Sequence, residues 1–193
     1  MAKKILNTLK KPPRTALFLL FDLNGLKYKK LAENYDINGY NRIYQIHIRK
    51  TGGTSLTHMI WATEKENTRE ITRQINRKWD RRIKVNDKIF AGWNPRIINR
   101  GHYYYAFSHT PIHKLDLPDN TFTFTCLRDP VKRVISHYKM LKNFEINNIK
   151  HPCMKIEGHW LGNSPADFLD RIPKEHLFNQ LYMFSINFDV DEA

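Results

Sequence analysis

Apolar residues gather in short runs along this chain, and their spacing predicts where strands and helices form. Residues 43–48, 103–107 and 122–127 are rich in Ile, Phe, Tyr and Thr, as strands are, and we expect the third to be buried. After the third run the spacing becomes that of a helix with one apolar face. The residues of this face are Val131, Val134, Ile135, Tyr138 and Leu141. Strands that run into helices indicate an open α/β sheet.

A turn of glycine and hydroxyl residues follows the first predicted strand directly. Its residues are Lys50, Thr51, Gly52, Gly53, Thr54 and Ser55. Glycines let the backbone approach an anion, and the free N–H groups of the following helix start point at it. A lysine beside such a turn can stabilise charge on a leaving group. The turn therefore predicts a site for a phosphorylated cofactor, although a small-residue turn between strand and helix can also be purely structural.

The order of residues in this turn excludes the commonest phosphate-binding motifs. A Walker A loop carries its lysine after the last glycine, followed by Ser or Thr, whereas Lys50 precedes the glycine pair. The chain contains no Gly-Lys-Ser/Thr and no Gly-x-Gly-x-x-Gly. An ordinary nucleoside triphosphatase and a dinucleotide-binding protein are therefore disfavoured.

A second strand-to-helix junction carries its own anion-binding groups. Asp129 is a suitable helix N-cap, and Pro130 suits the first helical position. Arg128 is thereby placed at the carboxyl end of a strand, where ligands of open α/β sheets bind. Ser136 lies off the apolar face of the helix, so its hydroxyl is available. Two such junctions suit a cofactor that carries phosphates at two ends.

These two segments resemble the cofactor motifs of sulfotransferases that use 3′-phosphoadenosine 5′-phosphosulfate (PAPS), specifically the branch with heparan sulfate 2-O- and 6-O-sulfotransferases and their bacterial relatives. Residues 47–55 resemble that family's His-Ile-Pro-Lys-Thr-Gly-Gly-Thr-Ser loop, and residues 127–138 resemble its Leu-Arg-Asp-Pro-x-x-Arg-x-x-Ser-x-Tyr motif. The resemblance covers roughly residues 40 to 190. It implies a three-layer, P-loop-like α/β fold with a central, mainly parallel sheet flanked by helices.

The same resemblance implies roles for particular residues. Lys50 through Ser55 would hold the 5′-phosphosulfate, while Arg128 and Ser136 would hold the 3′-phosphate. One position departs from the pattern, because Arg49 stands where the family usually has proline. Arg49 either strengthens anion binding or points to solvent, and we slightly favour solvent.

Transfer of a sulfuryl group to a hydroxyl needs a base, and histidine is the natural one near neutral pH. In the sulfotransferase family that this chain resembles, the candidate base lies shortly before the second motif. His109 has the best spacing and follows a predicted strand, with His113 as the alternative. His102 lies before that strand, at the wrong end of the sheet, and His47 is expected to be a core residue. Lys50 would stabilise the leaving phosphate, which makes His109 and Lys50 the predicted catalytic pair.

The composition limits the partners of the protein. The 193 residues carry a net charge of +13, which implies an acidic partner: the cofactor, an anionic glycan, nucleic acid or a membrane surface. We expect a glycan or other hydroxyl acceptor, and nucleic acid is less favoured. No metal is expected, since Cys126 and Cys153 lie far apart without metal-ligand spacing; we expect the first in a strand core and the second in a loop.

Residues 64–84 repeat both arginines and apolar residues at every fourth position. The arginines are Arg69, Arg73, Arg77 and Arg81, and the apolar residues are Ile71, Ile75, Trp79 and Ile83. The spacing predicts one amphipathic helix with an arginine ridge. The ridge is either a solvated face or a glycan-binding surface.

The ends of the chain complete the expected organisation. Residues 1–39 form a basic, partly ordered arm, and residues 40–193 form the sulfotransferase-like domain, with C-terminal truncation as one interpretation. The apolar run 15–21 is too short to span a bilayer, so no stable membrane span is expected. We expect a cytoplasmic protein of bacterial or viral origin, with membrane association, as in Golgi relatives, as the alternative. A related nucleotide or small-molecule kinase and a non-catalytic nucleic-acid-binding protein remain open as other functions.

Overall fold

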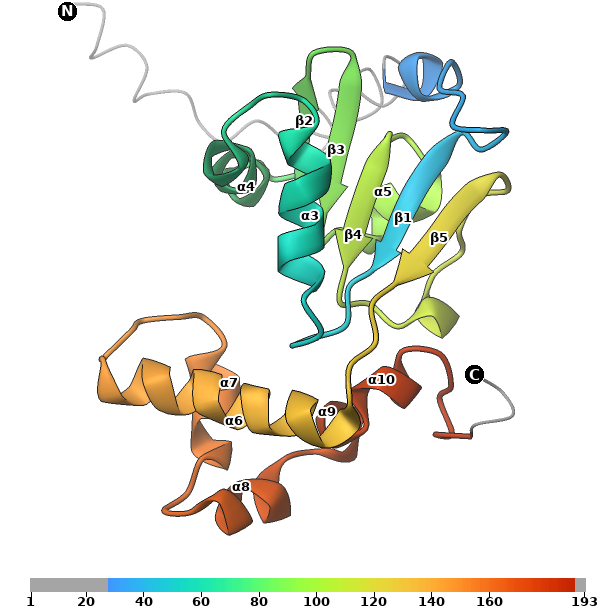
Figure 1. Cartoon of the computed structure of the whole chain (residues 1–193). Helices are drawn as coiled ribbons and strands as arrows, with labels where there is room; N and C mark the ends of the chain where they lie inside the picture. Colours follow the sequence, from blue (N-terminus) through green and yellow to red (C-terminus); the bar gives the residue numbers. More distant parts are fainter. Residues whose placement is uncertain (1–27, 190–193) are drawn as a thin grey trace, which may run out of the picture.

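A five-stranded sheet forms the centre of the protein in the computed structural model, which describes residues 28–189 (Figure 1). The strands are β1 (Arg42–Ile46), β2 (Arg82–Val85), β3 (Lys88–Gly92), β4 (Tyr105–Ser108) and β5 (Thr121–Thr125). Their order across the sheet is β2-β3-β4-β1-β5. Only β2 is antiparallel to its neighbour, whereas β3, β4, β1 and β5 run parallel. The predicted α/β fold with a mainly parallel sheet is confirmed.

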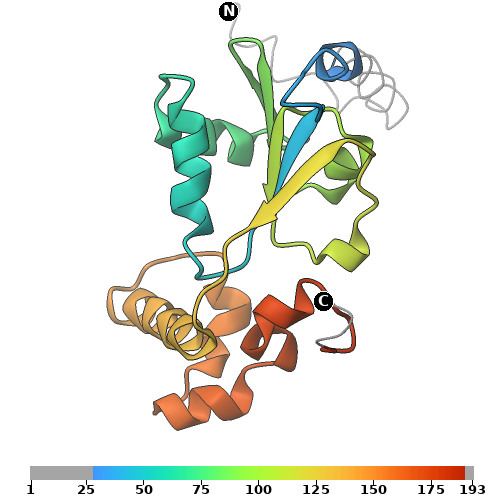
Figure 2. The same ribbon diagram turned by 45° about the vertical axis from the view of Figure 1, so that its right-hand side comes forward.

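Helices cover both faces of the sheet, and a group of further helices lies beyond the carboxyl ends of its parallel strands. In Figures 1 and 2, α3 and α4 lie on one face, α5 lies on the other, and α6 to α10 lie below the strand ends. The sheet-covering helices are α3 (Gly53–Ala62), α4 (Thr68–Arg77) and α5 (Pro95–Arg100). The others are α6 (Pro130–Ile146), α7 (Met154–Glu157), α8 (Pro165–Arg171), α9 (Lys174–Leu177) and α10 (Asn179–Tyr182), with 3₁₀ turns η2 (Ile112–Lys114) and η3 (Gly158–Trp160).

The core around the sheet has two parts, because the parallel strands are buried on both faces. Tyr44 and Ile46 of β1 pack toward α5, whereas Tyr105 and Phe107 of β4 pack toward α3 and α4. A third cluster lies beneath α6 and is formed by Leu141, Trp160, Leu161, Phe168 and Ile172. The segment beyond β5 therefore has an apolar core of its own.

The helix after β5 begins as predicted but buries a different face. Asp129 caps α6, since its side chain accepts a hydrogen bond from the Lys132 N–H, and Pro130 is the first helical residue. However, Val131 is 66% exposed and Ile135 is 46% exposed, so the predicted apolar face is only partly buried. The buried residues of α6 are Arg133, His137 and Leu141. Polar side chains lie inward here because they have specific partners, described below.

The expectation that residues 122–127 form a buried strand is also wrong. β5 is the edge strand of the sheet, so one of its sides has no neighbouring strand. Phe122 is exposed, and Cys126 is half-buried beyond the end of the strand rather than in its core. Strand composition alone does not distinguish an edge from a central position.

The single helix predicted over residues 64–84 is two elements. Asn67 caps α4, which ends at Arg77, and residues 82–85 form β2. Ile71 and Ile75 are buried as the helical spacing predicted, but Ile83 is buried as a strand residue and Trp79 is exposed. The four-residue repeat runs across the helix end by coincidence. The arginine ridge therefore does not lie along one helix, because Arg81 follows α4 with a positive φ of 58°.

Part of the predicted N-terminal arm packs on the sheet. Tyr35 donates a hydrogen bond to the Asp87 carbonyl and accepts one from the Ile89 N–H, and Ala32 is buried. Residues 1–27, which include the apolar run 15–21, lie outside the described residues. Between residues 28 and 189, no helix has the length and apolar character needed to cross a membrane.

Candidate functional site

The glycine turn predicted from the sequence lies at the carboxyl end of β1 and leads into α3. Gly52 precedes α3 with a φ of +92°, a conformation that glycine adopts without strain. Gly53 is required for a different reason, since a Cβ there would lie 2.2 Å from the His47 ring. No side chain caps α3, and the Ser55 N–H donates to the Gly52 carbonyl at 3.0 Å, so within the described residues the N–H groups of Gly53 and Thr54 are the ones left for an anion.

A buried polar network fixes this turn to the sheet. Gln45 of β1 donates to the Gly53 carbonyl and accepts a hydrogen bond from Thr57, at 2.7 Å, and from the Tyr105 hydroxyl. Thr51 donates to the Ile48 carbonyl at 3.0 Å. The turn is thereby held in one conformation before any ligand binds.

The second predicted motif meets the first directly. The Arg128 guanidinium donates a hydrogen bond of 3.1 Å to the carbonyl of Lys50, 78 residues earlier in the chain. Gln180 of α10 holds the Arg128 backbone from both sides, because it accepts from the Arg128 N–H at 2.7 Å and donates to the Arg128 carbonyl at 2.8 Å. The two motifs therefore belong to one site.

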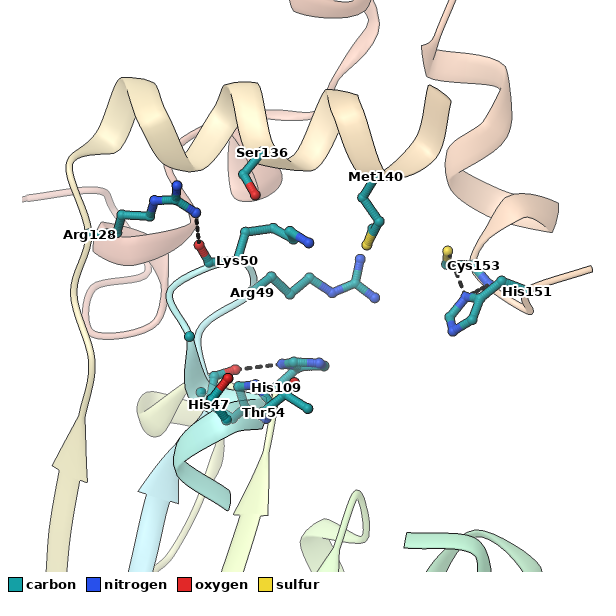
Figure 3. Close-up of a pocket in the computed structure, with 13 residues that line it drawn as sticks. His47, Arg49, Lys50, Thr54, His109, Arg128, Ser136, Met140, His151 and Cys153 are labelled. Carbon is teal, nitrogen blue, oxygen red and sulfur yellow. Dashed lines mark hydrogen bonds between the residues drawn. The ribbon is translucent and has the colours of Figure 1, made fainter. Parts of the chain in front are cut away.

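This site is a cavity of about 460 Å³ between the carboxyl ends of the parallel strands and α6. It is lined by His47, Arg49, Lys50, Gly52, Gly53, Thr54, Ser55, His109, Arg128, Ser136, Met140, His151 and Cys153. Figure 3 shows Arg128 and Ser136 on the side of α6, His109 on the side of the sheet, and Lys50 and Arg49 between them. All predicted site residues except Thr51 line the cavity, and Thr51 stabilises the turn.

The cavity is strongly cationic. Burial lowers the pKa of Lys50, and the neighbouring Arg128 lowers it further. Arg49 also lines the cavity, with its guanidinium paired with a carboxylate, as described below. Like charges held this close together favour a ligand with several negative charges.

His109 is oriented so that one ring nitrogen faces the cavity. Its Nδ1 contacts the carbonyl of His47, which can only accept, so Nδ1 carries the proton and Nε2 has a free lone pair. The ring packs against His47 and Trp93. Burial is the main reason that the pKa of His109 falls to about 4, so the imidazole is neutral at neutral pH.

The other histidines differ in position. His113 lies on η2 against Tyr182 and does not line the cavity. His102 lies before β4, at the opposite end of the sheet. His47 is buried, with a pKa lowered to about 3 mainly by burial, and its ring lines the cavity beneath the glycine turn.

Arg49 does not point to solvent, which corrects the interpretation favoured from the sequence. Its guanidinium forms an ion pair with Glu157, the last residue of α7, and its backbone N–H donates to Asn179 at 3.4 Å. Glu157 also accepts a hydrogen bond of 2.9 Å from His137 of α6. No sequence pattern marks Glu157.

The outer wall of the cavity comes from the segment that joins α6 to α7. Met140, His151 and Cys153 line it, and Cys153, expected in a loop, lies immediately before α7 with its sulfur 2.9 Å from His151 Nδ1. Within residues 28–189 no group of three or more His, Cys, Asp or Glu side chains is placed to hold a metal ion.

The fold and the site together define an α/β protein that binds an anionic ligand across the carboxyl ends of parallel strands. The family model described as "Sulfotransferase family" matches residues 33–159, more than half of the chain. The chain therefore belongs to the sulfotransferase family, which confirms the expected enzyme class, a PAPS-dependent sulfotransferase. Neither the curated proteins nor the solved structures include a significant match.

Proposed function

We propose that this enzyme transfers the sulfuryl group of PAPS to a hydroxyl of a carbohydrate acceptor within the cavity between Lys50 and Arg128. The observation that carries the proposal is the contact between the two motifs, in which the Arg128 guanidinium bonds to the Lys50 carbonyl. Two anion-binding segments that meet in this way suit a donor with negative charge at both ends.

Each end of the donor would be bound by different groups of the protein. The 5′-phosphosulfate would lie on residues 50–55, where the N–H groups of Gly53 and Thr54 at the start of α3 and the Lys50 ammonium would bind it. Asp129 already caps α6, so the 3′-phosphate would be bound by the side chains of Arg128 and Ser136 rather than by that helix end. The donor would thus span from the glycine turn to α6.

The reaction would be an in-line displacement at sulfur. The acceptor hydroxyl forms the new O–S bond while the bond from sulfur to the bridging oxygen breaks, and adenosine 3′,5′-bisphosphate leaves. His109 Nε2 takes the hydroxyl proton. Lys50 and the N–H groups of the turn stabilise the negative charge that grows on the leaving phosphate, an interaction stronger in the transition state than before it.

The pKa of about 4 describes His109 when no donor is bound. A bound donor brings negative charge next to the imidazole, which favours the protonated form and raises the pKa toward the range useful for a base. Donor binding would therefore activate His109 for proton transfer.

A glycan acceptor is supported by the excess of positive charge, +13 over the chain, which favours an acidic polymer. Transfer of radiolabelled sulfate from PAPS to a panel of polysaccharides would test this assignment. Labelling of acidic polysaccharides is expected, and labelling confined to small non-carbohydrate hydroxyl compounds would contradict it.

Donor identity can be tested by thermal stabilisation with adenosine 3′,5′-bisphosphate, magnesium ATP and oligonucleotides. We expect selective stabilisation by the bisphosphate, which Arg128→Ala abolishes. Arg96→Ala is a matched control because Arg96 is exposed on α5, away from the cavity. Stabilisation by magnesium ATP alone would favour a kinase, and stabilisation by oligonucleotides alone would favour a nucleic-acid-binding protein.

The base can be tested separately from donor binding. His109→Ala should keep its affinity for the bisphosphate and lose sulfuryl transfer by about 10²-fold or more, as loss of a general base does. His113→Ala should leave transfer unchanged, and the opposite result would move the base to His113.

A further inference from the structure

An ion pair and a hydrogen bond link the two donor-binding motifs a second time. The carboxylate of Glu157 pairs with Arg49 on one side and with His137 on the other. Arg49 is the neighbour of Lys50 in the glycine turn, and His137 is the neighbour of Ser136 on α6. Glu157 therefore contacts the residue next to each end of the donor site.

This bridge is buried. The Glu157 side chain is 5% exposed and the His137 side chain is fully buried. Although burial alone would raise it, hydrogen bonds from His137 and Arg49 hold the pKa of Glu157 at about 2. A paired carboxylate in such surroundings tolerates little movement of its partners, because loss of Arg49 leaves a buried charge unpaired and loss of His137 removes a buried hydrogen bond.

The geometry of neighbouring residues explains how the bridge acts on the donor. Successive residues of a helix point about 100° apart, so His137 can face inward while Ser136 faces the cavity. Lys50 has a φ of +67°, which turns the chain sharply directly after Arg49. The inward contacts of Arg49 and His137 thereby fix where Lys50 and Ser136 lie on the cavity side.

We propose that Glu157 is a positioning residue for sulfuryl transfer, which holds the glycine turn and α6 at the separation that a two-ended donor requires. This inference depends on the proposed use of PAPS. A ligand that contacts both ends gains affinity because the second contact is intramolecular once the first is made, and that gain is lost when the spacing is wrong. A ligand that contacts one end depends little on the spacing.

The experiment compares Glu157→Gln with the wild type for binding of adenosine 3′,5′-bisphosphate, adenosine 3′-monophosphate and adenosine 5′-monophosphate by calorimetry. We expect the bisphosphate affinity to fall about tenfold or more, with little change for either monophosphate. In turnover, the KM for PAPS should rise while the KM for the acceptor stays constant. Arg49→Gln breaks the same bridge from its less buried side, so its bisphosphate affinity should fall by a larger factor than its monophosphate affinities if Glu157→Gln does not fold.

Glu64→Gln is the matched control. Glu64 is 6% exposed and pairs with Lys88, which is 28% exposed, while Glu157 pairs with Arg49, which is 27% exposed. The same chemical change at the same burial should lower stability in both variants but leave donor binding unchanged in the control.

Two results would overturn the inference while leaving the proposed function intact. Unchanged bisphosphate affinity in both bridge variants would mean that the contacts of Glu157 serve stability alone. Tighter bisphosphate binding would mean that Glu157 only neutralises Arg49. If the wild type binds the bisphosphate no better than the monophosphates, the proposed function itself fails, and this inference fails with it.

Discussion

Replacement of Gly53 by alanine tests how tightly the glycine turn packs against His47 and its neighbour His109. The new methyl group would lie 2.2 Å from His47 Cδ2, 2.6 Å from His47 Nε2 and 3.0 Å from Gln45 Nε2. Ordinary carbon contacts lie near 3.5–4.0 Å, so the ring would have to move by roughly an ångström. It has little room, because Trp93, Phe107 and His109 surround it.

Two effects oppose each other in this variant. Overpacking a filled site costs about 1–3 kcal/mol, and a rigid, enclosed ring places this case near the upper end. Alanine in place of glycine within a helix returns up to about 1 kcal/mol. A net loss of about 1–2 kcal/mol in the free energy of unfolding would lower the melting temperature by roughly 2–8 °C for a domain of this size.

The assay for Gly53→Ala combines thermal unfolding with sulfuryl transfer. Turnover should also fall, because the displaced His47 carries the carbonyl that orients His109. Gly158→Ala is the control, since its methyl group would meet only the flexible end of Met154 at 3.2 Å and should leave stability unchanged or slightly higher. A Gly53→Ala protein as stable and as active as the wild type would refute the reasoning.

Three further substitutions or conditions give direct tests. Because the pKa of His109 is lowered from 6.5 to about 4 and that of His47 from 6.5 to about 3, the unfolded chain binds protons first as the pH falls. Stability should therefore be full above pH ~6.5 and fall toward pH ~4, by on the order of 3 kcal/mol for each histidine, as followed by melting temperature against pH. Gln180→Ala removes both contacts to the Arg128 backbone and should weaken bisphosphate binding about tenfold in calorimetry, while unchanged affinity would show that Arg128 needs no such support. Ser164→Ala removes the capping box of α8 and should lower the melting temperature by roughly 2–4 °C without changing donor affinity, since the cap lies outside the cavity.

The sequence predicted those parts of the fold that depend on local patterns. The runs that form β1 and β4, and the start of α6 at Asp129 and Pro130, follow from composition and capping preferences. The buried face of α6 did not follow from apolar spacing. Arg133 is buried because it donates to the His176 and Leu177 carbonyls, and these partners come from a distant segment.

The candidate site was predictable where it depends on topology. Lys50 and Arg128 follow β1 and β5, and the carboxyl ends of parallel neighbours in a sheet lie at the same edge. Glu157 was not predictable, because a single acidic residue at the end of a short helix carries no pattern. The one indication in the sequence that Arg49 has an acidic partner was that it stands where the family usually has proline. A cation near a buried site needs such a partner.

The sheet and the helical segment after β5 have different roles in the site. The sheet places the glycine turn and Arg128 at the carboxyl ends of β1 and β5, but it does not by itself hold Arg49 and Arg128 in place. That part is done by the segment after β5, where Gln180 holds the Arg128 backbone and Asn179 and Glu157 hold Arg49. The contacts made by Gln180, Asn179 and Glu157 come from outside the sheet. Substitutions at these residues should therefore alter donor affinity more than they alter the packing of the sheet.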